Sequence, residues 1–252
     1  MEKSVKISIQ MPIDANEIKK LSIIIPCYNE VKNISDVINR VASVDVGLEK
    51  EIIVVDDGSV DGTMKVLDEI KERYKGAEVL KIHFSMLNSG KGFAIRIGLK
   101  YATGQIVIIQ DADLEYDPED YPKILEPILK GEADVVYGSR FLNNPRPAGM
   151  ALMNRFANFI LAFLATILYG KKITDEATAY KAFRRDVLDS IELSCQRFEF
   201  CPEVTSKVLK KKYRLIEVPI NYRGRTSLEG KKITWWDGIV AISTLFKYRF
   251  RK

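Results

Sequence analysis

Short β-branched runs alternate with helix-forming segments through the first half of the chain, and this alternation constrains the fold more than any other feature. In residues 31–41, apolar side chains recur at helical spacing directly after the apolar run 21–26. Strands that alternate with helices of about 10–15 residues predict a doubly wound, mostly parallel, Rossmann-like α/β sheet with both faces covered. The predicted strands are residues 21–26, 52–55, 79–84, 106–110 and 133–137, and the predicted helices between them are 31–41, 61–74, 91–102 and 118–130.

In the second half of the chain, strands and helices no longer alternate regularly, and the sequence predicts longer, amphipathic helices. Helices are expected over 151–169, 202–212 and 234–249, with one strand over 214–222. Residues 156–170 carry no charge, but this stretch of 15 residues is shorter than the roughly 20 that a membrane-crossing helix needs. We therefore expect a chain that does not span a membrane by itself.

Three segments are expected along the chain. Residues 1–20 form an N-terminal extension without the apolar core of a secretory signal, 21–233 form one α/β domain, and 234–252 form a C-terminal amphipathic helix. Residues 207–252 contain 13 Lys and Arg against 3 Asp and Glu, a local charge of +10 that leaves −5 for the first 206 residues. An acidic front part and a basic tail indicate two different partners.

The use of histidine and cysteine excludes several kinds of site. His83 is the only histidine, which excludes a multi-histidine metal centre and argues against a Ser–His–Asp triad. Cys27, Cys195 and Cys201 are odd in number and lack CxxC spacing. This pattern favours a reduced, cytosolic protein over a disulfide framework or a zinc site. The basic tail lacks a recognition motif for nucleic acid, so no nucleic-acid partner is expected.

Polar residues follow four of the predicted strands at the point where each strand ends. They are residues 26–30 (PCYNE), 56–63 (DDGSVDGT), 88–92 (NSGKG) and 111–113 (DAD). Ligands bind beyond the carboxyl ends of the strands in an open parallel sheet, so these segments are expected to share one crevice. Segment 88–92 is similar to a glycine-rich phosphate loop, but it lacks P-loop spacing and does not indicate ATP hydrolysis.

Two pairs of aspartates are the strongest candidates for ligand binding in this crevice. Asp111 and Asp113 are two residues apart, so an extended backbone places both carboxylates on the same side. Such a pair repels itself unless a cation lies between the two, and carboxylate oxygens favour Mg²⁺ or Mn²⁺, the usual partners of a diphosphate. Asp56 and Asp57 could accept a hydrogen bond from a nucleobase, with an ordinary helix cap as the alternative.

These segments belong to a longer series of motifs that resembles the family 2 glycosyltransferases of the GT-A fold. The similarity is to the branch that uses polyprenyl or dolichyl phosphates, such as the mannose and glucose synthases, and it covers residues from about 21 to 245. The series is SIIIPCYNE (22–30), VVDDGSVDGT (54–63), NSGKGFAIRIGL (88–99), QDADLEYDPED (110–120), VVYGSRF (135–141), TDEATAYKAFRRDVL (174–188), FEFCPEV (198–204) and EVPINYRGRTSLEGKKI (217–233).

The resemblance implies a role for each matching residue. Residues near the first two strand ends would hold the base and ribose of a nucleotide sugar, Arg140 would face an acceptor phosphate, and Arg225 would close over the donor diphosphate. The implied donor-binding residues are Pro26, Tyr28, Glu30, Asp56, Asp57, Lys91, Asp111 and Lys232, the metal ligands are Asp111 and Asp113, and the catalytic residues are Asp113, Arg140 and Arg225.

Two positions depart from the family pattern. Ala179 stands where relatives often have glycine, which implies a small packing change. The helix after Arg140 lacks the arginine and serine that mannose synthases place there for the lipid phosphate, and Arg146 or Arg155 are the candidates to replace them. Recognition of the acceptor is therefore the part of the family pattern that this sequence matches least.

The expected activity is inverting transfer of mannose or glucose from a GDP- or UDP-linked donor to a polyprenyl or dolichyl phosphate, with Mg²⁺ or Mn²⁺ as cofactor. A phosphate nucleophile is already ionised at neutral pH, whereas a sugar hydroxyl would need a general base. The alternatives are a transferase that acts on a saccharide hydroxyl in cell-wall or exopolysaccharide synthesis, and a non-catalytic sugar-nucleotide-binding scaffold. The carboxylates available on the acceptor side are Asp175, Glu176, Glu199 and Glu203.

An apolar helix and an aromatic, basic C-terminus predict a peripheral position on the cytoplasmic face of a membrane. Residues 156–169 are apolar almost all round, and residues 235–252 mix Trp, Phe and Tyr with Lys and Arg. Aromatic side chains interleaved with cations suit a helix that lies in the interface of an anionic membrane. A homo-oligomer or a membrane subunit would use the same surface, and a buried core helix with a docking tail is the other interpretation.

Overall fold

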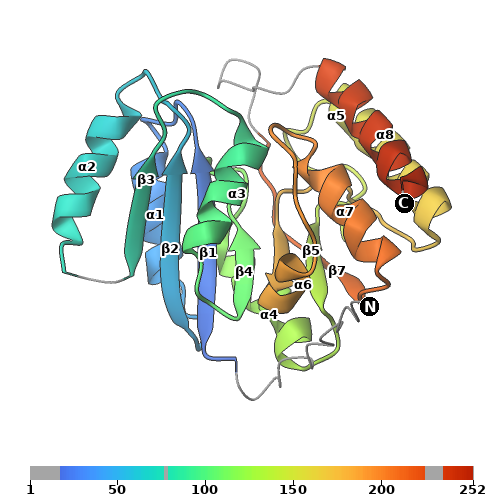
Figure 1. Cartoon of the computed structure of the whole chain (residues 1–252), viewed down its shortest axis with the longest axis horizontal. Helices are drawn as coiled ribbons and strands as arrows, with labels where there is room; N and C mark the ends of the chain where they lie inside the picture. Colours follow the sequence, from blue (N-terminus) through green and yellow to red (C-terminus); the bar gives the residue numbers. More distant parts are fainter. Residues whose placement is uncertain (1–17, 77–78, 225–234, 252) are drawn as a thin grey trace, which may run out of the picture.

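The computed structural model describes residues 18–76, 79–224 and 235–251, and in this part of the chain seven strands form one sheet (Figure 1). The strand order is β3-β2-β1-β4-β6-β5-β7. β6 runs antiparallel to β4 and β5, whereas the other neighbouring strands pair in parallel, so the expected mostly parallel α/β sheet is confirmed. The strands are β1 (Lys20–Cys27), β2 (Glu49–Asp56), β3 (Leu80–Phe84), β4 (Ile106–Ile109), β5 (Val135–Ser139), β6 (Lys181–Arg184) and β7 (Leu215–Pro219).

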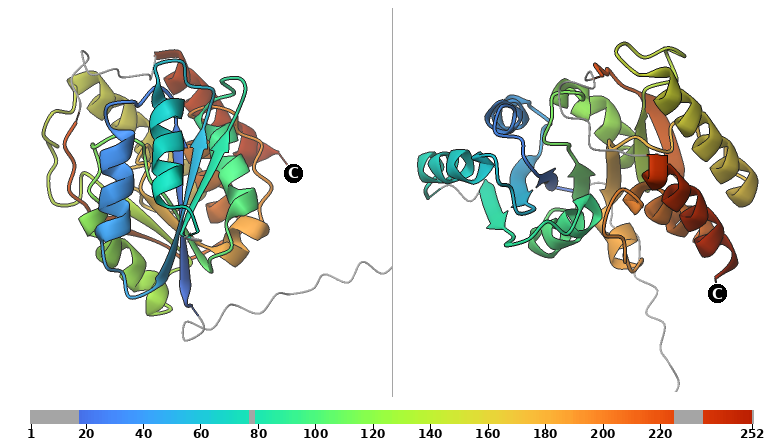
Figure 2. Two further views of the ribbon diagram at one scale, coloured as in Figure 1. Left: turned by 90° about the vertical axis from the view of Figure 1, so that its left-hand side faces the viewer. Right: turned by 90° about the horizontal axis from the view of Figure 1, so that it is seen from above.

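Helices cover both faces of the sheet. Helices α1, α2 and α4 pack on one face and α3, α6 and α7 on the other, while α5 and α8 pack against α7 at the end of the molecule remote from α1 and α2 (Figures 1 and 2). The helices are α1 (Ile34–Ser43), α2 (Thr63–Arg73), α3 (Lys91–Tyr101), α4 (Tyr121–Leu129), α5 (Leu152–Tyr169), α6 (Arg185–Asp189), α7 (Phe200–Lys210) and α8 (Trp235–Phe250), with a 3₁₀ turn, η2 (Pro118–Asp120), before α4.

The apolar strands are explained by burial on both sides. In β1, Ile23 and Ile25 pack into the cluster under α1 and α4, and Ile24 between them packs into the cluster under α3. Side chains alternate between the faces of a strand, so a strand covered on both faces must be apolar at successive positions. This is why β1, β2 and β4 appear where the sequence predicts them, whereas the predicted edge strand β3 is only partly buried.

Two elements were not predicted from the sequence. The strand β6 and the short helix α6 that follows it lie in the segment 181–189, for which no strand or helix was expected. β6 is inserted between β4 and β5 and is fully buried. Its insertion explains why β5 does not pair directly with β4.

The helix α5 corrects an expectation about membrane spanning. It has 18 residues with a mean hydropathy of 1.5, which makes it long enough and apolar enough to cross a membrane, by length and composition only. The expectation that the apolar segment is too short is therefore wrong on length, because α5 begins at Leu152 and includes Arg155 in its early turns. Only 22% of the helix is buried in the protein, and several of its large apolar side chains, such as Phe156, Phe159 and Phe163, are exposed.

Candidate active site

A cavity of about 900 Å³ lies at the carboxyl ends of β1, β2 and β4 and extends to the wall formed by α5 and α8. Most of the residues predicted for the site line it. They are Pro26, Tyr28, Glu30, Asp57, Lys91, Asp111, Asp113 and Arg140. Arg225 and Lys232 lie outside the described residues. The strand-end argument therefore brings the predicted side chains together in one place, while their individual roles stay predictions.

The adjacent aspartates at the end of β2 have different surroundings. Asp57 lines the cavity, and its carboxylate accepts hydrogen bonds from the backbone N–H groups of Ser89 (2.9 Å) and Gly90 (2.7 Å). Burial raises the pKa of Asp57 above its ordinary value. Asp56 is fully buried, does not line the cavity, and accepts hydrogen bonds from the backbone and hydroxyl of Ser59. Of the two, Asp57 is the one placed to meet a ligand, and Asp56 closes the turn after β2.

The glycine-rich segment before α3 is bound to a distant part of the chain. The N–H groups of Gly92 and Phe93 donate to the carbonyl oxygens of Arg197 (3.0 Å) and Gln196 (2.8 Å). Gly90 has a φ of +98°, and a Cβ atom built there would lie 2.6 Å from the Gln196 oxygen. Glycine is needed because the two backbones approach so closely. These amides already have protein acceptors, so the segment does not cradle phosphate as a P-loop does.

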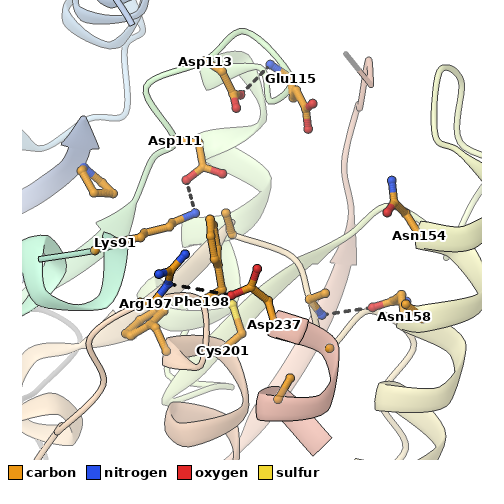
Figure 3. Close-up of a pocket in the computed structure, with 18 of the residues that line it drawn as sticks. Lys91, Asp111, Asp113, Glu115, Asn154, Asn158, Arg197, Phe198, Cys201 and Asp237 are labelled. Carbon is orange, nitrogen blue, oxygen red and sulfur yellow. Dashed lines mark hydrogen bonds and ion pairs between the residues drawn. The ribbon is translucent and has the colours of Figure 1, made fainter. Parts of the chain in front are cut away.

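The predicted metal pair lies beside a lysine (Figure 3). Lys91 forms an ion pair with Asp111, and Asp113, which is 7% exposed, accepts a hydrogen bond from the N–H of Glu115 at 3.0 Å. Burial alone would lower the pKa of Lys91, but the neighbouring Asp111 raises it above its ordinary value. Lys91 thus supplies positive charge to a carboxylate that a cation would otherwise neutralise.

The donor atoms at this place fit a divalent cation that shares its ligands with a substrate. Within the described ranges, no group of three or more His, Cys, Asp or Glu side chains could hold a metal ion. Mg²⁺ is typically bound through one or two carboxylates together with substrate phosphates and water. Asp111 and Asp113, which both line the cavity, match that pattern. The remaining ligands would come from a bound diphosphate.

Arg140 is held rigidly on the other side of the cavity. Its Nε and Nη2 atoms each lie 2.7 Å from a carboxylate oxygen of Asp175, and its guanidinium lies 5.1 Å from the centre of the Tyr222 ring. Burial works against the charge, but Asp175 raises the pKa of Arg140 well above its ordinary value. A bidentate pair of this kind fixes the direction of the guanidinium. Arg140 therefore stays charged and presents its remaining face to the cavity.

The far wall of the cavity comes from α5 and α8 and was not predicted as part of the site. Asn154 and Asn158 project from α5 across the cavity from Lys91, and Asp237 in the first turn of α8 lies 3.9 Å from Arg197 (Figure 3). Asn158 is buried and interrupts the otherwise apolar run 156–165 of α5. One amide side chain in a long apolar run is a signal from which the sequence could have identified it. Asp237 offered no comparable signal.

The same wall also contributes apolar side chains to the cavity. Met153, Leu161 and Trp235 line it from α5 and α8, beside the polar side chains named above. The opposite side carries Asp111, Asp113 and Lys91, and Arg140 also lines the cavity. A single cavity thus combines charged groups that suit a diphosphate and a cation with apolar side chains that suit part of a hydrocarbon chain.

Comparison with known proteins agrees with this geometry. The chain is 31% identical over 221 residues to a dolichol-phosphate mannosyltransferase of Pyrococcus furiosus, covering 85% of this chain and 60% of that protein. It is 34% identical over 217 residues to a UDP-N-acetylglucosamine–dolichyl-phosphate N-acetylglucosaminyltransferase of Methanococcus voltae, covering 80% of this chain and 85% of that protein. The chain therefore spans less than two thirds of the first relative and most of the second.

Solved structures show the same fold at low sequence identity. Glucosyl-3-phosphoglycerate synthase of Mycobacterium tuberculosis, crystallised with Mn²⁺, UDP and phosphoglyceric acid, has a TM-score of 0.68 at 21% identity, covering 94% of this chain and 81% of that chain. The expected GT-A fold is thereby confirmed. A sequence profile described as glycosyl transferase family 2 matches residues 22–192, and with the two relatives it establishes that this chain belongs to glycosyl transferase family 2.

Proposed function

We propose that this glycosyltransferase moves a hexose from a GDP- or UDP-linked donor to a polyprenyl phosphate at a membrane surface. The observation that carries the proposal is the cavity, which joins the carboxylates Asp111 and Asp113 to the apolar wall of α5 and α8, with Arg140 also on its lining. The two relatives named above act, by their names, on dolichyl phosphates. A donor at one end and a lipid acceptor at the other account for both kinds of lining.

At the donor end, Asp57 and the segment 26–30 would bind the nucleoside, and Lys91 would lie beside the diphosphate. Asp111 and Asp113 would hold Mg²⁺ or Mn²⁺, which neutralises charge on the diphosphate when it is bound. Arg225 and Lys232, which lie outside the described residues, keep their proposed role of approaching the leaving diphosphate. Binding of donor and cation together would replace the contact between Lys91 and Asp111.

At the acceptor end, an oxygen of the lipid phosphate would attack C1 of the sugar while the bond from C1 to the diphosphate oxygen breaks. The products are the lipid phosphosugar, with inverted configuration at C1, and a nucleoside diphosphate. Arg140 would orient the attacking phosphate by charge-assisted hydrogen bonds. No proton has to be removed from a phosphate that is already ionised, so the reaction needs no general base.

Three of the four carboxylates predicted on the acceptor side are already engaged within the protein. Asp175 is paired with Arg140, and Glu199 accepts hydrogen bonds from the N–H groups of Gln196 and Arg197. Glu203 is buried and bonded to Ser194, Cys195 and Lys207. These three are poorly placed to remove a proton from a hydroxyl, which leaves Glu176, also on the cavity lining, as the candidate base for the saccharide alternative.

Release of nucleoside diphosphate tests the proposal directly. UDP- and GDP-sugars would be screened with Mg²⁺ or Mn²⁺, with and without a short polyprenyl phosphate. We expect release that depends on both the cation and the lipid phosphate, with one donor base strongly preferred. Release stimulated by a saccharide and not by the lipid phosphate would establish the saccharide alternative. Nucleotide-sugar binding without turnover under any condition would support the scaffold alternative.

The outer face of α5 and α8 supports a location on the cytoplasmic surface of a membrane. Lys247, Arg249 and Arg251 are exposed on or just after α8, and among the described residues Cys27, Cys195 and Cys201 form no disulfide, which suits a reducing compartment. Cations beside exposed aromatic side chains favour binding to anionic lipid. The large apolar side chains exposed on the two helices, of which the second and the seventh also line the cavity, are Leu152, Met153, Phe156, Phe159, Phe163, Ile167, Trp235, Trp236, Ile239, Phe246 and Phe250.

Phe163→Glu is expected to weaken binding to vesicles of mixed neutral and anionic phospholipid by about tenfold or more. The substitution removes a phenyl group that would insert into the membrane and puts a negative charge in its place. Phe163 is 54% exposed on α5. Met64→Glu is the matched control, because Met64 is 40% exposed on α2, remote from α5. Vesicle co-sedimentation measures both variants. Equal loss in both, or loss in neither, would contradict the assignment of this face to the membrane.

A further inference from the structure

Glu176 is a buried carboxyl group in the cavity wall that the proposed reaction does not use. Its side chain is fully buried, the residue lines the cavity, and neither carboxyl oxygen makes a hydrogen bond of normal geometry. Carboxylates buried without hydrogen bonds are costly in free energy and usually become neutral or gain a partner. The position of Glu176 therefore needs a physical explanation.

Hydrogen bonds hold the backbone on both sides of Glu176, so the loop cannot easily move to bring this carboxyl group into water. Glu217 accepts hydrogen bonds from the N–H groups of Thr174 and Asp175, and Asn158 accepts one from Ala177 at 3.0 Å. The ammonium group of Lys181 donates to the carbonyl oxygen of Glu176 itself at 2.8 Å. The chain on both sides of Glu176 is thus fixed by contacts from β7, α5 and β6.

Several charged groups surround Glu176. Arg140 and Asp175 compensate each other at 2.7 Å, whereas Lys181 donates to two carbonyl oxygens and lies 3.9 Å from the ring centre of Tyr137. No ion pair joins Lys181 to a carboxylate within the part of the chain that the structure describes. The titratable and polar groups around Glu176 come from several elements. They are Arg140 and Asp175 from the loops after β5 and α5, Lys181 from β6, Tyr137 from β5, Thr205 and Cys201 from α7, and Glu217 from β7.

The charges in this cluster are close to balance, and an added anion would disturb that balance. Two cations, Arg140 and Lys181, stand against three acids, Asp175, Glu176 and Glu217. Burial raises the pKa of Glu176 to about 7, although Lys181 and the Thr205 hydroxyl act to lower it. A phosphate that binds beside Arg140 brings negative charge into the same poorly solvated region. Added negative charge disfavours the ionised form of a neighbouring acid.

We propose that Glu176 takes up a proton when a phosphate binds beside Arg140, and that it thereby acts as a positioning residue for the anion site. This rests on the proposed function, because it takes the acceptor to be a phosphate. Binding and protonation are linked reciprocally, so the protonated form of Glu176 binds the phosphate more tightly. The contribution of Glu176 to the affinity for the phosphate is therefore largest below the pKa of Glu176 in the free protein. This contribution falls as the pH rises through neutrality.

Calorimetry with a short polyprenyl phosphate at pH 7, in buffers of different ionisation enthalpy, measures the protons taken up on binding. We expect wild type to take up a clear fraction of a proton more than Glu176→Gln, because carboxyl groups are partly ionised at a pH near their pKa. From pH 6.5 to 8.5, the affinity of wild type should fall about tenfold relative to that variant. Asp189→Asn is the matched control, because Asp189 is an exposed partner of Arg185, and it should behave as wild type.

Two outcomes separate this inference from the proposed function. Binding of the phosphate by wild type without extra proton uptake overturns the role of Glu176 alone. No binding by wild type overturns the phosphate acceptor and the inference with it. If Glu176→Gln does not fold, infrared difference spectra of wild type decide the question. The band of a protonated carboxyl group must grow when the polyprenyl phosphate is added, and its absence contradicts the proposal.

Discussion

Asp113→Asn is expected to lower the rate of cation-dependent sugar transfer on the order of 10³-fold, because it removes a charge that holds the cation and the leaving diphosphate. Asparagine keeps the size of the side chain and an oxygen that can accept the hydrogen bond from the N–H of Glu115. The fold should therefore survive, which circular dichroism and thermal unfolding would verify. The measurement is release of nucleoside diphosphate over a range of Mg²⁺ and Mn²⁺ concentrations.

Asp117→Asn provides the matched control for this variant. Asp117 follows Asp113 by four residues, accepts a hydrogen bond from the N–H of Glu119 at 3.2 Å, and caps the 3₁₀ turn η2 in a half-buried position. It does not line the cavity. Its substitution should leave both the rate and the cation dependence nearly unchanged. A rate for Asp113→Asn equal to that of the control would show that Asp113 does not hold the cation.

Arg140→Met is expected to lower the free energy of unfolding by about 3–5 kcal/mol, because it leaves Asp175 buried without its partner. Asp175 is fully buried, and both of its oxygens accept hydrogen bonds from the guanidinium of Arg140. The same substitution should abolish the stimulation of turnover by a polyprenyl phosphate. Urea unfolding measures the first effect and release of nucleoside diphosphate the second.

A second substitution separates these two effects. In Arg140→Met combined with Asp175→Asn, no charge is left unpaired at this place, so much of the lost stability should return. The asparagine oxygen can still accept the hydrogen bond that the backbone N–H of residue 140 now gives to Asp175 at 3.0 Å. Turnover should not return, because the guanidinium is still missing. Full lipid-dependent activity in the double variant would rule out a chemical role for Arg140.

The period of the apolar residues predicted most of the fold because the first strands are buried on both faces. It failed at β6, where Lys181 and Arg184 are the first and last residues. Both are buried, because Lys181 donates to carbonyl oxygens and Arg184 pairs with Asp134 and Asp186. Buried charges that find specific partners do not appear in a hydrophobic pattern, since the pattern scores each of these residues as polar and therefore as exposed.

Within the site, the strand-end rule placed the crevice correctly but could not assign every side chain. Asp56 and Asp57 are neighbours in the sequence, and only the structure shows that one faces Ser59 and the other the cavity. The helix α5 was predicted over 151–169 and found at Leu152–Tyr169, but the membrane criterion counted only the uncharged residues after Arg155. A charge near the end of an apolar stretch does not end a helix, because a long side chain can carry its charge to solvent.

The segment 194–197 contacts α3 on the donor side of the protein and α7 and α8 on the acceptor side. These contacts limit how parts of different family members can be combined in one chimeric enzyme. The carbonyl oxygens of residues 196 and 197 accept hydrogen bonds from the first turn of α3. Glu203 of α7 accepts hydrogen bonds from the N–H groups of residues 194 and 195, and Tyr248 of α8 donates to the same carboxylate at 2.8 Å. An acceptor half grafted from a relative would therefore bring a new backbone surface against the glycines before α3. To exchange substrate preference between family members, a chimera must therefore take the segment 194–197 and the start of α3 from the same parent.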